Sequence, residues 1–378
     1  MPSDRLHALH AAGQSIWLDY IDRRMLVDGS LERRIRDEAL TGMTSNPTIF
    51  EKALAEGQAY DEQLHAAREG LSAWELFELV EVKDVQDACD QFRGVYDATN
   101  GADGYVSIEV SPGVANDPDA TIEEGRRLWA AVDRPNVMVK VPGTESGARA
   151  VEALLAEGVN VNVTLLFSVD AHRRVMEAYL TALEARVARG EAVDRVASVA
   201  SFFVSRVDNE VDKRLDALAA TLPEERRAHA LALRGKAAIA NAAMAYQAFH
   251  QTFAGPRWEA LAAKGAMVQR PLWASTSTKN PAYRDVLYVE QLIGPDTVNT
   301  MPPATLDAFR DHGETARTVD ADPAGAERVL ADLEALGISM REVTDKLLAE
   351  GIASFQKSFD GLLGGLERRV ASLAAAVR

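Results

Sequence analysis

The order of apolar and helical segments predicts an α/β fold, a (β/α)8 TIM barrel with extra helices. Eight short apolar runs alternate with helical segments along the chain, which is typical of parallel strands joined by helices. Most of these runs lack alternating polar residues, so we expect both faces of each strand to be buried. The alternative is a doubly wound open sheet, but no Gly-rich dinucleotide motif follows an early strand.

The eight strands are predicted from apolar runs that end at turn-forming residues. Pro47 restricts the residue before it to extended conformations, so the second strand should end at Asn46. The fourth is the run from Asn136 to Val141, which Pro142 and the following glycine stop. The other strands are predicted at residues 15–21, 105–111, 159–167, 196–203, 269–275 and 297–301.

The helices are predicted from capping residues and from apolar residues at helical spacing. The first helix should cover residues 3–13, and residues 59–98 should be helical in two pieces. Hydroxyl residues that precede or open helices are expected at Thr48, Thr121, Thr144, Ser168 and Ser205, with Asp170 as an alternative to Ser168. The Ala-rich stretch after residue 210 is longer than one barrel helix needs. We therefore expect one barrel domain, 1–378, with a helical insertion around 210–265 and C-terminal helices over 323–378, weakened at Gly364-Gly365.

Composition limits the classes of partner. The chain has 41 basic and 57 acidic residues and a formal net charge of −16, which argues against binding to nucleic acid or to an anionic membrane. The single cysteine, Cys89, excludes intramolecular disulfides. No apolar run approaches the ~20 residues of a membrane span, and no signal core is seen. We expect a cytoplasmic protein.

One charged residue interrupts the fourth predicted strand. Lys140 lies inside an apolar run, two residues before Pro142. Burial would disfavour the ammonium form and lower the pKa of this lysine, and a neutral amine can form a Schiff base with a carbonyl. The alternatives are a structural pair with a carboxylate on a neighbouring strand, which would favour the charged form, and a side chain that points out of the sheet.

Polar residues recur near the carboxyl ends of the first seven predicted strands, where barrels carry their active sites. A single buried charge would indicate a structural pair, because burial of an unpaired charge is costly. A whole layer of polar residues instead predicts an active site, with a satisfied structural network as the alternative. The residues are Asp19, Asn46, Glu109, Lys140, Asn162 with Thr164, Ser201 and Ser275.

Five segments strengthen this prediction. They read TSNPTIF at 44–50, VKVPGT at 139–144, NVNVTLLFS at 160–168, SFFVSR at 201–206 and WASTSTKNP at 273–281. Together, and in this order, they resemble the motifs of the transaldolases, in particular the longer bacterial subfamily of these class I Schiff-base enzymes. The resemblance runs from about residue 15 to 303 and covers all eight predicted strands.

The resemblance implies an activity and roles for residues. It implies transfer of a dihydroxyacetone unit, without metal or other cofactor, from fructose 6-phosphate or sedoheptulose 7-phosphate to erythrose 4-phosphate or glyceraldehyde 3-phosphate in the pentose phosphate pathway. Lys140 matches the Schiff-base lysine and Asp19 the acid/base at the C4 hydroxyl. Glu109 and Thr164 match the pair that positions a water, and Asn46 and Asn162 match residues that hold the intermediate.

A sugar phosphate also requires an anion site. Ser201 lies near the end of the sixth predicted strand, and Arg206 follows in the first turn of a helix, where a phosphate is favoured. Lys279, with Ser275 or Ser277 beside it, is the next candidate. The alternatives are an ion pair of Arg206 with Asp208 or Glu210, and a solvated loop charge for Lys279.

Other features have no predicted chemistry. None of the seven histidines lies at a predicted strand end, so we expect no zinc site and no histidine base; His172 should pack or face solvent. Two rival functions stay open: a fructose-6-phosphate aldolase that releases free dihydroxyacetone, and a non-catalytic sugar-phosphate-binding barrel. Such aldolases resemble this pattern but have Tyr where Phe203 stands and Gln in place of Glu109. We expect a monomer or a homodimer.

Overall fold

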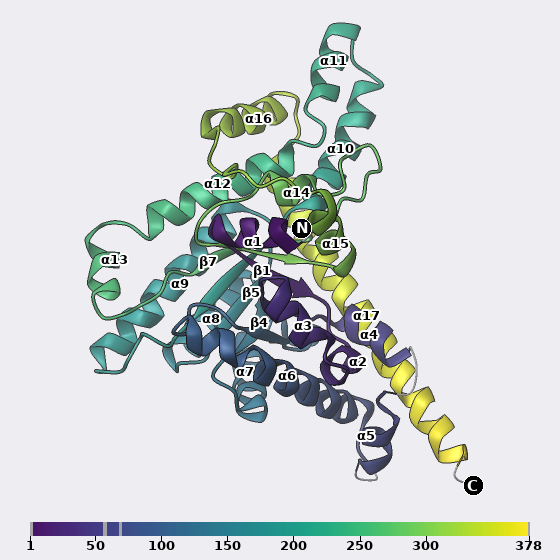
Figure 1. Ribbon diagram of the computed structural model, residues 1–378. Coiled ribbons are helices and arrows are strands. Elements are labelled where there is room, and N and C mark those ends of the chain that lie inside the picture. The colour runs from purple at the N-terminus through teal and green to yellow at the C-terminus, as the bar shows by residue number, and fades with distance from the viewer. Residues whose placement is uncertain (1–2, 56–58, 68–69, 377–378) are drawn as a thin grey trace.

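The computed structural model describes residues 3–55, 59–67 and 70–376, and its centre is a closed barrel of eight parallel strands in sequence order (Figure 1). This confirms the predicted fold class. The strands are β1 (Gln14–Asp19), β2 (Leu40–Thr44), β3 (Val106–Glu109), β4 (Val137–Pro142), β5 (Val161–Leu166), β6 (Ser198–Phe203), β7 (Arg270–Ala274) and β8 (Thr297–Met301). Nearly every residue of these strands is buried, as expected when helices cover the outside and side chains fill the inside.

Helices surround the barrel and close part of its mouth. Those of the first half are α1 (Ser3–Ala11), α2 (Arg23–Val27), α3 (Ser30–Asp37), α4 (Pro47–Ala55), α5 (Asp61–Ala66), α6 (Ala73–Ala98), the short 3-10 helix η1 (Pro112–Val114), α7 (Pro118–Val132), α8 (Glu145–Ala156) and α9 (Val169–Ala188). Those of the second half are α10 (Ser205–Ala219), α11 (Glu224–Ala232), α12 (Ala237–Thr252), α13 (Gly255–Ala262), α14 (Leu287–Glu290), α15 (Pro303–His312), α16 (Pro323–Ala335) and α17 (Met340–Ala376). The expected insertion around 210–265 corresponds to α10–α13, of which α10 and α11 extend away from the barrel beside α16 (Figure 1).

Two predicted helix starts are wrong. Thr48 does not cap α4, because the helix already begins at Pro47, where a missing N–H costs nothing. Asn46 takes the capping role instead, since its Oδ1 accepts a hydrogen bond from the Ile49 N–H at 3.1 Å, and β2 therefore ends at Thr44. Likewise, Asp117 rather than Thr121 caps α7.

The caps of α8 and α9 are confirmed. Thr144 accepts a hydrogen bond from the Gly147 N–H, and Ser168 accepts one from the Ala171 N–H. Ser168 is thus the cap, not its alternative Asp170. Each cap directly follows a barrel strand, β4 or β5, so it fixes where the chain leaves the mouth of the barrel.

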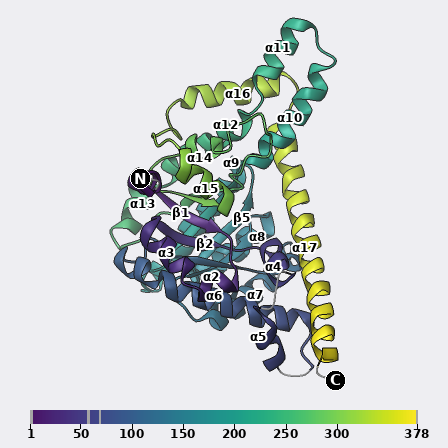
Figure 2. The ribbon, with the colours of Figure 1, turned by 45° about the vertical axis from the view of Figure 1, so that its right-hand side comes forward.

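The last helix, α17, is continuous over 37 residues, so the weak point expected at Gly364-Gly365 is not a break. Figure 2 shows it running along the whole height of the molecule, beside α4 and past the barrel. Tertiary packing on α4, α6 and α10 offsets the low helix propensity of the two glycines. Within the described ranges, no helix is both long and apolar enough to cross a membrane.

His172 is buried. It lies on α9 with 0% exposure, and its ring is 5.8 Å from that of Phe202. This confirms packing rather than exposure. Burial lowers the pKa of His172 from 6.5 to about 3, because the charged ring cannot be solvated there.

We predict that this histidine makes the fold sensitive to acid. An unfolded chain binds a proton at His172 below pH ~6.5, whereas the folded protein resists it down to about pH 3. Stability is therefore complete above pH 6.5 and falls by up to about 1.4 kcal/mol per pH unit below it. His172→Leu should flatten this acid slope in urea unfolding measured at pH 7, 6 and 5. Parallel pH profiles for the variant and the wild type would contradict the account.

Candidate active site

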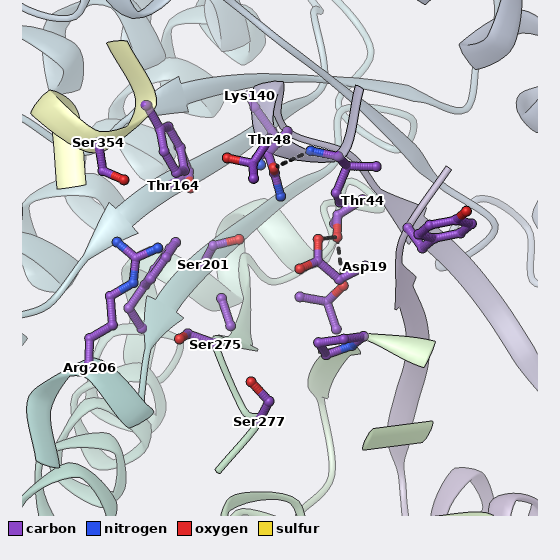
Figure 3. A pocket seen from close by; sticks show the side chains of 18 of the residues that line it. Asp19, Thr44, Thr48, Lys140, Thr164, Ser201, Arg206, Ser275, Ser277 and Ser354 are labelled. Carbon is purple, nitrogen blue, oxygen red and sulfur yellow. Dashed lines mark hydrogen bonds between the residues drawn. The ribbon is translucent and has the colours of Figure 1, made fainter. Parts of the chain in front are cut away.

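A cavity of about 450 Å³ opens at the carboxyl ends of the strands. Residues from β1, β2, β4, β5, β6, β7 and β8 line it, and α4 and α17 contribute its outer wall. Figure 3 shows the side chains of Asp19, Lys140, Thr164, Ser201 and Arg206 converging on this space from different strands. The cavity thus lies where chemistry is found in barrels of this kind.

Lys140 lies deep in the cavity and is held by two acceptors. Its Nζ donates to the Glu109 carboxylate at 2.9 Å and to the Ser45 carbonyl at 2.9 Å. The register of β3 and β4 places Glu109 directly opposite Lys140, which explains the contact. The structure therefore shows the ion pair that the sequence left open as an alternative. The same amine also faces the cavity, so pairing and access to a ligand coexist.

Glu109 and Thr164 flank the lysine from the neighbouring strands, β3 and β5. Burial raises the pKa of Glu109, and the contact with Lys140 opposes this rise. Glu109 does not itself line the cavity, whereas Thr164 does. The Thr164 hydroxyl is buried and has no hydrogen-bond partner among the described residues. A buried hydroxyl without a partner is suited to bind a water or a substrate oxygen.

Asp19 ends β1 on the other side of the cavity. Its carboxylate accepts a hydrogen bond from the Thr44 hydroxyl at 2.8 Å, and the Thr44 hydroxyl contacts that of Thr300 at 2.7 Å. Burial raises the pKa of Asp19, and the charge of Lys140, the bond from Thr44 and the charge of Arg206 oppose the rise. Asp19 is thus an oriented carboxylate, biased toward holding a proton.

Of the predicted amide and hydroxyl residues, Asn46 and Ser201 line the cavity and Asn162 does not. Asn46 lines the cavity while its Oδ1 caps α4. Asn162 is fully buried and does not line the cavity, because its amide donates to Ser107 at 3.0 Å and accepts from Ser201 at 2.7 Å. Ser201 lines the cavity. Asn162 therefore orients Ser201 from beneath the cavity surface.

Cations gather at the outer side of the cavity. Arg206 lies in the first turn of α10, as predicted, and its guanidinium stacks over the Phe203 ring at 5.2 Å. Neither Asp208 nor Glu210 pairs with it: Asp208 accepts from Tyr288 and Ala238, and Glu210 pairs with Arg214 and Lys346. Among the described residues Arg206 has no ion-pair partner, which leaves it available for an anion.

Lys279 and Ser275 complete this side. Both line the cavity, as does Ser277, and Lys279 is exposed. The hydroxyl of Ser275 contacts that of Ser205 at 3.0 Å, and the backbone of Ser275 has the left-handed φ of 56°. The turn after β7 therefore brings hydroxyl and amine groups to the cavity that Arg206 also lines, an arrangement suited to a phosphate.

The sequence reasoning missed several lining residues. Thr44 lies inside a segment that had been singled out, so its place at the end of the second strand, two residues before Asn46, was a usable signal. Lys52 on α4 and Ser354 and Phe355 on α17 had no such signal. Helices far from β1 in the sequence bring them to the mouth, and no local pattern shows where those helices pack.

The described parts of the chain contain no cluster of three or more His, Cys, Asp or Glu side chains that could hold a metal ion. Cys89, on α6, is fully buried, and burial raises the pKa of its thiol above the usual range. Such a thiol is protonated and unreactive.

Comparisons with known proteins show the family of the chain. A family model described as transaldolase/fructose-6-phosphate aldolase matches residues 16–366. A relative from Parafrankia sp. (strain EAN1pec), named transaldolase, is 48% identical over 99% of this chain and 100% of its own length. One of the same name from Thermobifida fusca (strain YX) is 49% identical over 97% of this chain and 98% of its own. Transaldolase 2 of Nostoc sp. (strain PCC 7120) is 46% identical over 99% of this chain and 100% of its own.

Proposed function

The chain belongs to the transaldolase/fructose-6-phosphate aldolase family, and from the site at the mouth of its barrel we infer that it is a transaldolase. It transfers a dihydroxyacetone unit from a ketose phosphate to an aldose phosphate in the non-oxidative pentose phosphate pathway. One observation carries the mechanism: the Lys140 amine, 2.9 Å from a buried carboxylate, faces a cavity that also contains Asp19 and an unpaired arginine.

In the first step, the Lys140 amine adds to the C2 carbonyl of the ketose. Lys140 must first lose a proton, and Glu109 is the carboxylate in contact with it. Burial, which raises the pKa of Glu109, makes this acceptor more basic than an ordinary glutamate. The carbinolamine then loses its hydroxyl as water. We assign the proton delivery to Glu109 through a water held by the free hydroxyl of Thr164.

In the second step, the C3–C4 bond breaks. Asp19 takes the proton of the C4 hydroxyl, the C4 oxygen becomes the aldehyde of the leaving aldose, and the electron pair passes into the iminium to give an enamine. Burial raises the pKa of Asp19 and so makes its carboxylate a stronger base than an ordinary aspartate, which suits a group that takes this proton and returns it when the acceptor aldehyde adds.

The enamine must survive until the acceptor arrives. We assign its hydroxyl contacts to Asn46 and Ser201, with Asn162 holding Ser201 in place. Phe203 supplies an apolar wall without a hydroxyl, so it cannot protonate the enamine carbon. This distinguishes the chain from the aldolase alternative, in which we expect Tyr at this position.

The phosphate of either sugar binds at Arg206, Ser275 and Lys279 in this proposal, supported by the unpaired state of Arg206 and by the placement of all three at one side of the cavity. The substrates are therefore small sugar phosphates.

The location of the enzyme follows from the charge of its substrates. Sugar phosphates are charged and do not cross membranes unaided, so we propose a cytoplasmic enzyme, acting as a monomer or homodimer.

The function is tested by supplying fructose 6-phosphate with and without erythrose 4-phosphate. With the acceptor, we expect continuous formation of sedoheptulose 7-phosphate and glyceraldehyde 3-phosphate. Without it, the enamine is stranded, so glyceraldehyde 3-phosphate should appear as a burst of about one equivalent of enzyme. Rapid multiple-turnover release of dihydroxyacetone without acceptor would identify the aldolase alternative, and no turnover under either condition would indicate a non-catalytic barrel.

A further inference from the structure

One face of the C-terminal helix α17 lies against the mouth of the barrel. Gly351, Ser354, Phe355 and Ser358 are three or four residues apart and therefore share this face. Ser354 and Phe355 line the cavity. Phe355 is buried, whereas Ser354 is exposed toward the opening. The helix thus presents an apolar wall and a hydroxyl to any ligand that enters.

Gly351 allows α17 to approach the site closely. A Cβ at this position would lie 2.9 Å from Leu165 Cδ2 and 3.8 Å from Arg206 Nη1. Leu165 lies within the register irregularity of β5, between Val163 and Leu166, and has a left-handed φ of 58°. The helix backbone therefore passes beside the Arg206 guanidinium. One turn later, Ser354 lies on the same side of the cavity as Arg206, and both line it (Figure 3).

Contacts on both sides of Ser354 hold α17 in this position. The Thr48 hydroxyl donates to that of Ser358 at 2.8 Å, which joins α17 to α4. Phe359 packs edge-on against Trp74 and Phe77 of α6. On the other side, Lys346 pairs with Glu210 of α10. Ser354 is therefore carried by a helix that is fixed before and after it.

The two glutamates in the groove beside Arg206 are paired with other cations. A groove beside Arg206 and Ser354 contains Glu210 and Glu350. Lys346 pairs with both, and Arg214 also pairs with Glu210. Among the described residues, neither the Arg206 guanidinium nor the Ser354 hydroxyl has a hydrogen-bond or ion-pair partner. In a chain of net charge −16, an unpaired arginine beside an unpaired hydroxyl is suited to receive an anionic group.

We propose that Ser354 of the C-terminal helix is a phosphate-binding residue, whose hydroxyl donates to a phosphate oxygen of the bound sugar phosphate next to the Arg206 guanidinium, which binds the same phosphate. This rests on the proposed transaldolase function, since it takes the ligand to be a sugar phosphate. It makes α17 a part of the binding site rather than a support for the barrel.

The test compares Ser354→Ala with Ser354→Thr. Loss of one hydrogen bond to a charged group should raise the KM for fructose 6-phosphate by about 10-fold with little change in kcat. The inhibition constant of inorganic phosphate should rise in parallel. Ser354→Thr keeps the hydroxyl and should restore both constants. Ser354→Asp places a negative charge against the phosphate and should weaken binding further than Ser354→Ala.

Ala353→Asp provides the matched control, because this neighbouring residue is exposed and does not line the cavity. It should leave KM nearly unchanged. An equal effect of Ala353→Asp and Ser354→Asp would overturn the proposal, as would unchanged constants in Ser354→Ala. Calorimetric binding of inorganic phosphate needs no turnover. If the wild type fails as a transaldolase but Ser354→Ala still weakens phosphate binding, only the proposed function has failed.

Discussion

Replacing Lys140 with alanine should abolish turnover. Among the described residues that line the cavity, the other lysines are Lys52 and Lys279, which lie on α4 and in the turn after β7 rather than on a strand. Without the covalent intermediate there is no iminium to accept the electron pair of the C3–C4 bond. We expect kcat to fall by on the order of 10³-fold or more, measured as glyceraldehyde 3-phosphate formation from fructose 6-phosphate and erythrose 4-phosphate.

Two further variants separate chemistry from folding. Removing Lys140 leaves Glu109 buried without its partner, and breaking a buried pair in this way costs about 3–5 kcal/mol unless the carboxyl takes up a proton. Lys140→Met keeps the volume, and Lys140→Met with Glu109→Gln also removes the stranded charge. The double variant should recover stability in urea unfolding but not activity. Turnover near the wild-type rate in any Lys140 variant would contradict the assignment.

Asp19→Asn is the second change with a large expected effect. The amide cannot take the proton of the C4 hydroxyl, so kcat should fall by about 10²–10⁴-fold, the usual size of a general-base contribution. The Schiff base should still form, because Asp19 does not contact the Lys140–Glu109 pair through any hydrogen bond in the described structure. The experiment therefore measures steady-state kcat together with borohydride-dependent inactivation by fructose 6-phosphate.

Asp19→Asn should lower activity but keep or raise the stability of the fold. Because the folded protein raises the pKa of Asp19, the ionised carboxylate destabilises the fold at pH 7, and this cost disappears as pH falls below the ordinary value of 3.8. Asp19→Asn should therefore keep or raise the Tm at pH 7, with a smaller difference in acid. Asp170→Asn, at an exposed carboxylate of α9, is the control and should change neither kcat nor Tm. A lower Tm together with normal kcat in Asp19→Asn would refute its role.

The barrel strands and the reactive lysine were accessible from the sequence because their signals are local. A strand buried on both faces is a short apolar run, and β8 was predicted at its observed bounds, Thr297–Met301. A lysine in such a run is conspicuous. The helix starts were less certain, because Asn46 and Thr48 are both good caps and only the tertiary structure decides between them.

The remainder of the site depends on packing between distant segments. Nothing around Ser354 indicates that α17 passes the mouth of the barrel, since that path is set by its contacts with α4, α6 and α10. Asn162 likewise lies in a recognisable segment, but its amide is occupied by Ser107 and Ser201. Whether a polar side chain reaches the cavity or supports another that does depends on side-chain contacts across strands.

The most direct test of the covalent mechanism is borohydride reduction in the presence of fructose 6-phosphate, followed by peptide mass spectrometry. Reduction converts the iminium to a stable secondary amine on the attacking lysine. We expect one adduct, carrying a three-carbon unit or the whole sugar phosphate, on the peptide that contains Lys140, and none without sugar. An unmodified Lys140 peptide, or an adduct on Lys52 or Lys279 in its place, would contradict the account.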